Sequence, residues 1–118
     1  MEFKFKKDVS LDKRKEASQT LLNNEPKKVP IILEKDPNCK LEGIAKTRHL
    51  ILRSFTVNKF IALIRQSIKI SESDALFLSA KGKYSITGET TIDEVYKKYK
   101  DKDDNFLYIM YSTEVVYG

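Results

Sequence analysis

The chain has 118 residues, enough for one domain with a single hydrophobic core. Hydrophobic residues make up 41% and charged residues 33% of it, which excludes an intrinsically disordered or membrane-embedded class and favours a globular domain. The formal net charge of +5 favours an acidic partner, which leaves an acidic peptide, a nucleic acid and an anionic lipid surface as candidates.

Targeting and redox signals are sparse. No apolar run approaches the roughly 18 to 20 residues that span a bilayer, and residues 1–4 (Met-Glu-Phe-Lys) lack a signal-peptide core. The single cysteine, Cys39, has no partner for an intramolecular disulfide, which suits a reducing compartment. We therefore expect a cytoplasmic protein.

The first predicted element is a helix over residues 10–24. Ser10 is a suitable N-cap, and Asp12 lies in the first turn, where negative charge complements the helix dipole. Pro26 limits the helix at its C-terminal end. Its apolar stripe is thin, which predicts a helix on the surface of a larger body; the stripe consists of Leu11, Ala17, Leu21 and Leu22.

Two predicted strands follow, over residues 29–34 and 48–55, with a loop at 36–38 between them. The next helix, over residues 56–68, has the clearest pattern. Its apolar residues recur at the helical period on one face: Val57, Phe60, Ile61, Ile64 and Ile68.

The C-terminal part alternates strands with a short helix. Strands are predicted at 75–80 and 84–87, joined by a turn at Lys81-Gly82. Thr91 and Glu94 have capping-box spacing, and Ile92, Val95, Tyr96 and Tyr99 continue it as a short amphipathic helix. The last strand, 106–111, is apolar on both alternating sets, which predicts cover on both faces of the sheet.

This order of elements predicts an α+β fold of the β-grasp (ubiquitin-like) type. In such a sheet the last strand lies centrally, beside the first strand and parallel to it. The doubly apolar segment 106–111 fits that place, and the helix over 10–24 is a candidate to cover its second face. A ferredoxin-like domain is the main rival.

Charge is unevenly distributed along the chain. Residues 43–71 contain no acidic residue but six basic ones, namely Lys46, Arg48, Arg53, Lys59, Arg65 and Lys69. This pattern is compatible with a nucleic-acid-binding domain. Against that alternative, no RNP-like run is present, and the aromatic residues of 106–111 are better explained as core.

Catalytic, metal and cofactor sites find little support. His49 and Cys39 lie ten positions apart with a loop between them, and a Cys/His pair needs direct contact and usually a third orienting group. No Cys/His cluster or phosphate-binding glycine motif occurs. The acidic group Asp101, Asp103 and Asp104 lacks EF-hand spacing and is interpreted as a solvated loop. We expect no catalytic residue, metal or cofactor.

The chain ends in Glu-Val-Val-Tyr-Gly, residues 114–118. Because a terminal glycine has no Cβ, its carboxylate can enter a narrow active site and be approached there by a nucleotide or a thiol. A glycine at the last position is, by itself, weak evidence for such a reaction.

The sequence resembles the GABARAP and microtubule-associated protein light chain family of autophagy modifiers along nearly its whole length. The segments that carry the resemblance are 25–26, 29–35, 56–65, 74–77, 106–112 and 116–118. The resemblance implies a ubiquitin fold with two additional N-terminal helices. It divides the chain into a helical extension, 1–26, and a ubiquitin-like part, 27–118, whose tail, 113–118, is expected to be flexible.

The resemblance also implies a conjugation cycle in which the chain is a substrate and not an enzyme. An activating enzyme would adenylate the Gly118 carboxylate with ATP, and a conjugating enzyme would carry it as a thioester. Amide formation with phosphatidylethanolamine would then attach the protein to the autophagosomal membrane, and a cysteine protease would process or release it. No nucleic-acid partner is expected on this reading, and the protein is expected to be cytoplasmic until it is lipidated.

Family members bind receptor motifs of the form aromatic-x-x-aliphatic, and the bound peptide adds a strand beside the strand at 48–52. When the family's binding residues are carried over to this sequence by position, the resemblance implies an aromatic pocket formed by Leu21, Pro30, Ile32, Lys46, Arg48, Leu50 and Phe106. An aliphatic pocket would use Ile51, Leu52, Phe55, Phe60 and Leu63. Acidic residues that flank the motif would meet a basic rim of Lys46, Arg48 and Arg65.

The sequence departs from the family pattern at several places. Ala17 stands where an acidic residue is usual, His49 where an aromatic ring is common, and Leu52-Arg53 where Pro-Ser is typical. Ala17 and Leu52 would alter the pocket walls, so the motif preference stays open. Whether residues after Gly118 are removed from a precursor also stays open, as does an unconjugated β-grasp scaffold that keeps only the groove.

Overall fold

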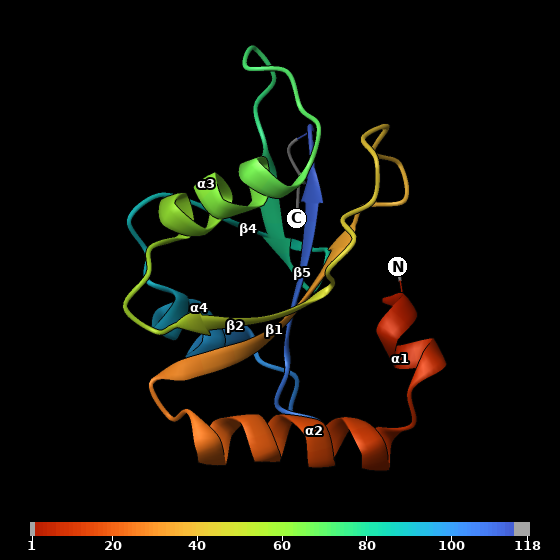
Figure 1. Cartoon of the computed structure of the whole chain (residues 1–118), viewed down its shortest axis with the longest axis vertical. Helices are drawn as coiled ribbons and strands as arrows, with labels where there is room; N and C mark the ends of the chain where they lie inside the picture. Colours follow the sequence, from red (N-terminus) through yellow and green to blue (C-terminus); the bar gives the residue numbers. More distant parts are fainter. Residues whose placement is uncertain (1, 115–118) are drawn as a thin grey trace.

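The computed structural model describes residues 2–114. Nine elements follow one another along this part of the chain (Figure 1). They are α1 (Lys4–Asp8), α2 (Leu11–Asn24), β1 (Lys28–Lys35), β2 (Arg48–Leu52), α3 (Val57–Ser67), β3 (Phe77–Ala80), β4 (Tyr84–Ile86), α4 (Ile92–Tyr99) and β5 (Leu107–Ser112). The first two helices are the additional N-terminal helices expected before the ubiquitin-like part.

The five strands form one mixed sheet in the order β2-β1-β5-β3-β4. β5 lies at the centre, parallel to β1 and antiparallel to β3, with Leu33 opposite Ile109. All six residues of β5 are buried, because helices cover the sheet on both faces. This confirms the α+β, β-grasp prediction and the central place of the last strand.

The principal core lies between the sheet and the helices α3 and α4. Along β1, the residues Val29, Ile31 and Leu33 face this core, and Phe60 and Ile64 of α3 pack against them. Three side chains cap the helices by accepting a hydrogen bond from the backbone N–H three residues on: Ser10 for α2, Thr56 for α3 and Thr91 for α4.

A second, smaller core lies on the opposite face of the sheet. There Phe3 and Phe5 of the N-terminal segment pack on Ile32 of β1 and on residues of the β5 segment, with Ala17 and Leu21 of α2 alongside. Figure 1 shows α2 crossing below the sheet and α1 turning up beside it. The N-terminal helices therefore supply the cover that the doubly apolar last strand requires.

The acidic segment after α4 is not simply a solvated loop, as its sequence suggested. The Asp104 side chain has no exposed surface and lies 2.8 Å from the Arg14 Nε of α2. It also accepts hydrogen bonds from the Tyr108 hydroxyl (2.5 Å) and from the Phe106 amide (2.9 Å). Asp101 is paired with Lys6 of α1. The prediction failed because the cations that hold these carboxylates lie about ninety residues away in the sequence.

Three strands, β2, β3 and β4, are shorter than predicted, β4 by one residue. β2 ends at Leu52 because the chain turns there: the Phe55 amide donates to the Leu52 carbonyl, 3.1 Å away, and the next helix begins at Val57. β3 begins at Phe77, two residues after the predicted start. In residues 2–114, no helix combines the length and apolarity needed to cross a bilayer.

Candidate functional site

β2 is an edge strand, paired only with β1 among the described elements. Its register places Pro30 opposite Leu50 and Val29 opposite Ile51. On an edge strand, alternate backbone N–H and C=O groups point away from the sheet and can pair with an added strand. The geometry therefore offers the backbone partner that strand addition needs.

Alternation along β2 divides the predicted pocket residues between the two faces of the sheet. Ile51 belongs to the principal core, under α3, and the neighbouring residue Leu50 points to the opposite face, which α2 covers. A peptide strand added beside β2 would alternate in the same way. Its successive side chains would therefore reach a patch on each face.

Apart from Lys46, the residues of the predicted aromatic pocket lie on the α2 face, where Leu21 packs against the cluster that contains Ile32 and Phe106. Ile32 and Phe106, which form the floor of this predicted pocket, are almost fully buried, with exposed fractions of 0% and 1%. Pro30 is buried as well, and Leu50 is half-buried. Lys46 is found on the other side, lining a cavity beside α3.

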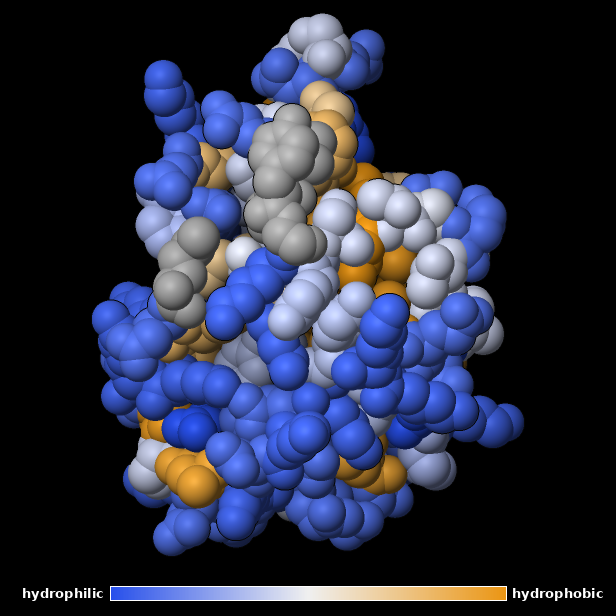
Figure 2. All heavy atoms as spheres, turned by 180° about the vertical axis from the view of Figure 1, so that it is seen from behind, coloured by the Kyte–Doolittle hydropathy of each residue, from blue (hydrophilic) through white to orange (hydrophobic). Residues whose placement is uncertain are grey.

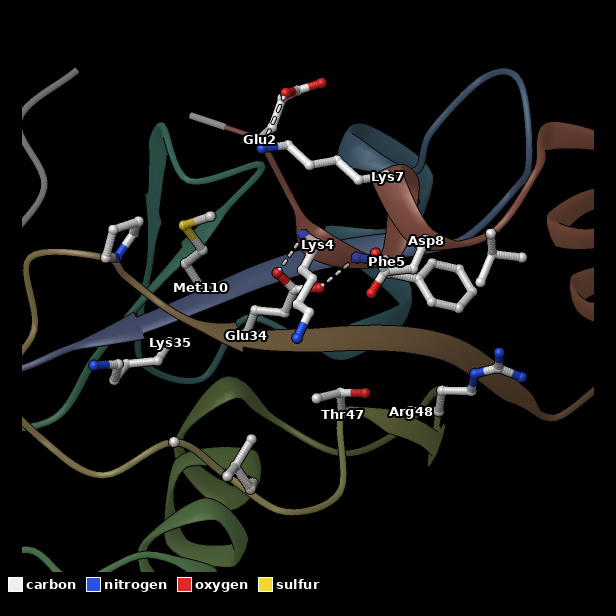
Figure 3. Close-up of a pocket in the computed structure, with 14 residues that line it drawn as sticks. Glu2, Lys4, Phe5, Lys7, Asp8, Glu34, Lys35, Thr47, Arg48 and Met110 are labelled. Atoms are coloured by element: carbon white, nitrogen blue, oxygen red, sulfur yellow. Dashed lines mark hydrogen bonds and ion pairs between the residues drawn. The ribbon is translucent and has the colours of Figure 1, made fainter.

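The floor of this predicted pocket is covered by an aromatic side chain of the chain itself. The Phe5 ring lies 5.2 Å from the Phe106 ring in an edge-to-face arrangement, and the Arg48 guanidinium lies over its other side, 4.8 Å from the ring centroid. In Figure 3 the ring points from α1 toward Arg48 of β2. Phe5 is thus a candidate site residue that the sequence did not predict.

The backbone of α1 is tied to β1 by a single carboxylate. The amides of Lys4 and Phe5 donate to the two oxygens of Glu34, at 2.7 and 2.9 Å (Figure 3). Beside this contact lies a cavity of about 800 Å³ between α1, the end of β1 and the loop that precedes β2. Its lining carries the basic residues Lys4, Lys7, Lys35 and Arg48 and the acidic residues Glu2, Asp8 and Glu34.

On the α3 face, a smaller cavity of about 260 Å³ brings together three of the five residues predicted for the aliphatic pocket, namely Ile51, Phe60 and Leu63. Leu63 is 38% exposed at its rim, whereas Phe60 is buried in the core. Leu52 and Phe55 lie outside this cavity, after the chain has begun to turn.

His49 forms part of the wall of the smaller cavity. Its Nε2 lies 2.8 Å from the Lys46 carbonyl oxygen, and its ring meets Phe60 edge to face at 6.0 Å. Burial lowers the pKa of His49 below its ordinary value of 6.5, because the charged imidazolium loses hydration there. The neutral ring is therefore favoured in the folded chain.

Not all of the basic residues around this surface are equally available. Arg53 is paired with Asp93 at 2.7 Å, and Arg65 donates hydrogen bonds to the carbonyls of Ser71 and Asp74. Arg48 lies over Phe5. Figure 2 shows hydrophilic side chains over most of the lower half of the opposite side of the molecule, with apolar surface in separate patches.

Cys39 is buried, and its carbonyl accepts a hydrogen bond from the Lys35 ammonium. Within residues 2–114, no group of three or more His, Cys, Asp and Glu side chains is arranged to hold a metal ion. Around β2 the structure thus places a backbone edge between the aromatic cluster under α2 and the smaller cavity beside α3. The predicted conjugation residue, Gly118, lies outside the described residues.

Comparisons with known proteins agree with the fold and with the sequence resemblance. The model of the family described as "Autophagy protein Atg8 ubiquitin like" matches residues 13–118. The crystal structure of Trypanosoma brucei ATG8 superimposes with a TM-score of 0.90 at 26% sequence identity, covering 100% of both chains. The family match spans the sheet, α3, α4 and most of α2. The chain therefore belongs to the Atg8 ubiquitin-like family of autophagy proteins.

Proposed function

We propose that this chain is an autophagy modifier that is conjugated through Gly118 to phosphatidylethanolamine and that binds receptors through the β2 edge. The observation that carries the proposal is the family match, which runs to the end of the chain and includes Gly118. In this role the protein is a substrate and carrier. It would be cytoplasmic when free and bound to the autophagosomal membrane when lipidated.

Conjugation needs a carboxylate that enters the active sites of other enzymes. The Gly118 carboxylate would attack the α-phosphate of ATP on an activating enzyme, releasing pyrophosphate and forming an acyl adenylate. A cysteine thiolate of that enzyme would displace AMP, and thiol exchange would pass the acyl group to the conjugating enzyme. The amine of phosphatidylethanolamine would then displace the thiolate to form an amide. The lipid would supply acyl chains for membrane attachment, and a cysteine protease would cleave the bond again.

Reconstitution tests this step. The protein is incubated with the activating and conjugating enzymes of the cascade, ATP and liposomes that contain phosphatidylethanolamine, and the lipid-linked product is separated by electrophoresis. We expect product from the parent and from Leu11→Ala, a control at an exposed position of α2, and none from Gly118→Ala. Equal product from Gly118→Ala would show that another residue is the acceptor.

Receptor binding is supported by the geometry of β2. No strand within residues 2–114 pairs with its outer edge, which has an apolar cluster on the α2 face and a cavity beside α3 on the other. A motif of the form aromatic-x-x-aliphatic would use one patch for each anchor. Acidic flanks would meet the cations near the strand, Lys46 and Arg48. Because each anchor contributes roughly 1.5–3 kcal/mol, partly offset by ordering of the peptide, we expect weak and reversible binding.

The alternative of a nucleic-acid-binding domain rested on the acid-free stretch 43–71. Two of its six cations are already engaged, Arg53 with a carboxylate and Arg65 with backbone carbonyls. The third alternative, an unconjugated scaffold, keeps the groove but not the lipid. It would be supported if a motif peptide bound the protein while the reconstituted cascade left Gly118 unmodified.

A further inference from the structure

The N-terminal helix α1 places an aromatic ring where the proposed receptor motif would place its own. The Phe5 ring is 7% exposed and contacts Phe106 at 5.2 Å and Tyr108 at 6.4 Å between ring centroids. The Arg48 guanidinium stacks over it at 4.8 Å. Phe106 and Arg48 are both residues of the predicted aromatic pocket. The ring therefore already has the edge-to-face and cation–π contacts that this pocket would offer a ligand.

The Phe5 ring belongs to the buried cluster that contains the floor of the pocket. Ile32 and Phe106 are 0% and 1% exposed, and both belong to the cluster that contains Phe5. Since interiors are close-packed, a second aromatic ring cannot be added to this cluster without displacing a side chain. Of the cluster's other aromatic members, Phe3 packs on Tyr108 at 5.0 Å between ring centroids, Tyr108 is fixed by its hydrogen bond to the buried Asp104, and Phe106 adjoins the central strand β5. Phe5 is carried by a five-residue helix at the surface.

α1 is held by the burial of Phe3 and Phe5 in the second core and by a small set of polar contacts. No side chain of the helix caps its own N-terminus, and Glu34 supplies that function from β1. The Lys6 ammonium pairs with Asp101 at the surface, and Arg14 donates to the Val9 carbonyl at 2.6 Å. A helix this short is not stable on its own, and exposed ion pairs contribute little. Displacement of α1 therefore costs mainly the burial of its aromatic ring, Phe5, together with the hydrogen bonds to Glu34.

Space for the displaced ring exists beside its present position. The cavity of about 800 Å³ next to α1 is lined by Phe5 itself and by the apolar residues Val9, Ile44 and Met110. It opens between α1 and the loop before β2, on the side of the sheet that carries Glu34 (Figure 3).

We infer that Phe5 is an internal competitor for the aromatic pocket, and that α1 must shift before a receptor's aromatic side chain can bind. The inference rests on the proposed receptor-binding function and names how that same site is regulated. The apparent affinity of the parent is then the intrinsic affinity multiplied by the fraction of molecules in which Phe5 has left the pocket. The same displacement frees Arg48 to meet an acidic flank of the motif.

Peptide titration by calorimetry tests this competition. The probe is the acetylated peptide Glu-Asp-Asp-Trp-Glu-Ser-Leu-Glu-Glu, together with the same peptide carrying Ala in place of Trp. We expect Phe5→Ala to bind the Trp peptide about threefold to tenfold more tightly than the parent, because the competitor is removed. The Ala peptide should gain nothing, since it has no ring to place in the pocket.

Two further variants distinguish the effect of the Phe5 ring from the effect of the rest of α1. Glu34→Ala removes the carboxylate that holds the α1 amides while leaving Phe5 in place, and it should also tighten binding of the Trp peptide. Lys7→Ala, on the same helix at an exposed position, should leave the affinity within twofold of the parent.

In the parent, saturation with the Trp peptide should increase hydrogen exchange at the Lys4 and Phe5 amides. This last readout does not depend on the folding of any variant.

The possible failures are distinguishable. Unchanged or weakened binding by Phe5→Ala, or unchanged amide exchange at Lys4 and Phe5 on saturation, would overturn the inference while receptor binding stands. If the Trp peptide binds neither the parent nor any variant, the proposed receptor-binding function itself fails, and the inference falls with it.

Discussion

Asp104 illustrates how single side chains join distant parts of this chain. Its buried carboxylate accepts from Arg14 of α2, from the Tyr108 hydroxyl and from the Phe106 amide. Burial and the hydrogen bond to Asp104 together raise the pKa of Tyr108, so this hydroxyl stays a donor at every physiological pH. Of the described buried side-chain nitrogen and oxygen atoms, each has a hydrogen-bond partner. The network fastens α2 to the sheet.

Removal of one member of this network should be costly. Arg14→Ala would leave the Asp104 carboxylate buried without its counter-ion, so we expect the free energy of unfolding to fall by about 3–5 kcal/mol. Urea denaturation followed by circular dichroism measures this change. Lys7→Ala, which removes an exposed ion pair at 3.5 Å, is the matched control and should change the unfolding free energy little. A similar small loss for both variants would show that the buried pair is not what fastens α2.

His49 gives the protein a specific pH dependence. It is the only histidine of the chain, and its folded-state pKa lies below 6.5. As pH falls through 6.5, the unfolded chain takes up a proton that the folded chain resists, so the free energy of unfolding should decrease until the folded-state pKa is passed. His49→Gln should remove this decrease between about pH 7 and pH 5, where few other groups titrate. An identical pH profile for parent and variant would contradict the assignment.

At the scale of elements, local sequence determined most of the fold but not α1. Hydrophobic periodicity predicted α3 and α4, capping chemistry predicted the starts of α2 and α4, and the doubly apolar pattern predicted the centrality of β5. In the α1 segment, Phe3 and Phe5 lie two positions apart, a spacing that is typical of a strand and not of a helix. The carboxylate that caps the helix belongs to Glu34, thirty residues away in the sequence. A helix whose stability comes from such distant contacts leaves no local signal.

The candidate site was predictable to a similar extent. The edge position of β2 follows from the fold. The family resemblance predicted Ile51, Phe60 and Leu63 for the aliphatic pocket, and the structure brings these three residues together around one cavity. The covering ring of Phe5 could not be predicted, because it depends on how α1 packs. Phe60 lines this cavity but is only 1% exposed, so its substitution would test stability more than binding.

Leu63 offers a cleaner test of the aliphatic side of the groove. Because it is 38% exposed at the rim of the cavity, Leu63→Ala should leave the unfolding free energy nearly unchanged. We expect it to weaken binding of an aromatic-x-x-aliphatic peptide about tenfold, since a buried leucine contact is lost. Leu11→Ala, at an equal exposure of 38% on α2, is the control and should bind as the parent does. Equal affinities for all three proteins would place the aliphatic anchor elsewhere.

The described part of the molecule is one sheet that helices cover on both faces. Helices α3 and α4 enclose the principal core, and α1 and α2 enclose the second. Between the two faces, the outer backbone edge of β2 pairs with no other strand in the part of the chain that the structure describes. Family membership assigns the chain to the autophagy modifiers, and the proposed conjugation would use Gly118, at the end of the chain that continues from the central strand β5.

The measurement that tests this account most directly is the mass of the C-terminal peptide of the protein recovered from cellular membranes. After proteolysis, tandem mass spectrometry identifies what the Gly118 carbonyl carries. The account predicts an amide with phosphatidylethanolamine, which adds the mass of the lipid less one water. A membrane-bound protein whose Gly118 carboxylate is free would contradict it.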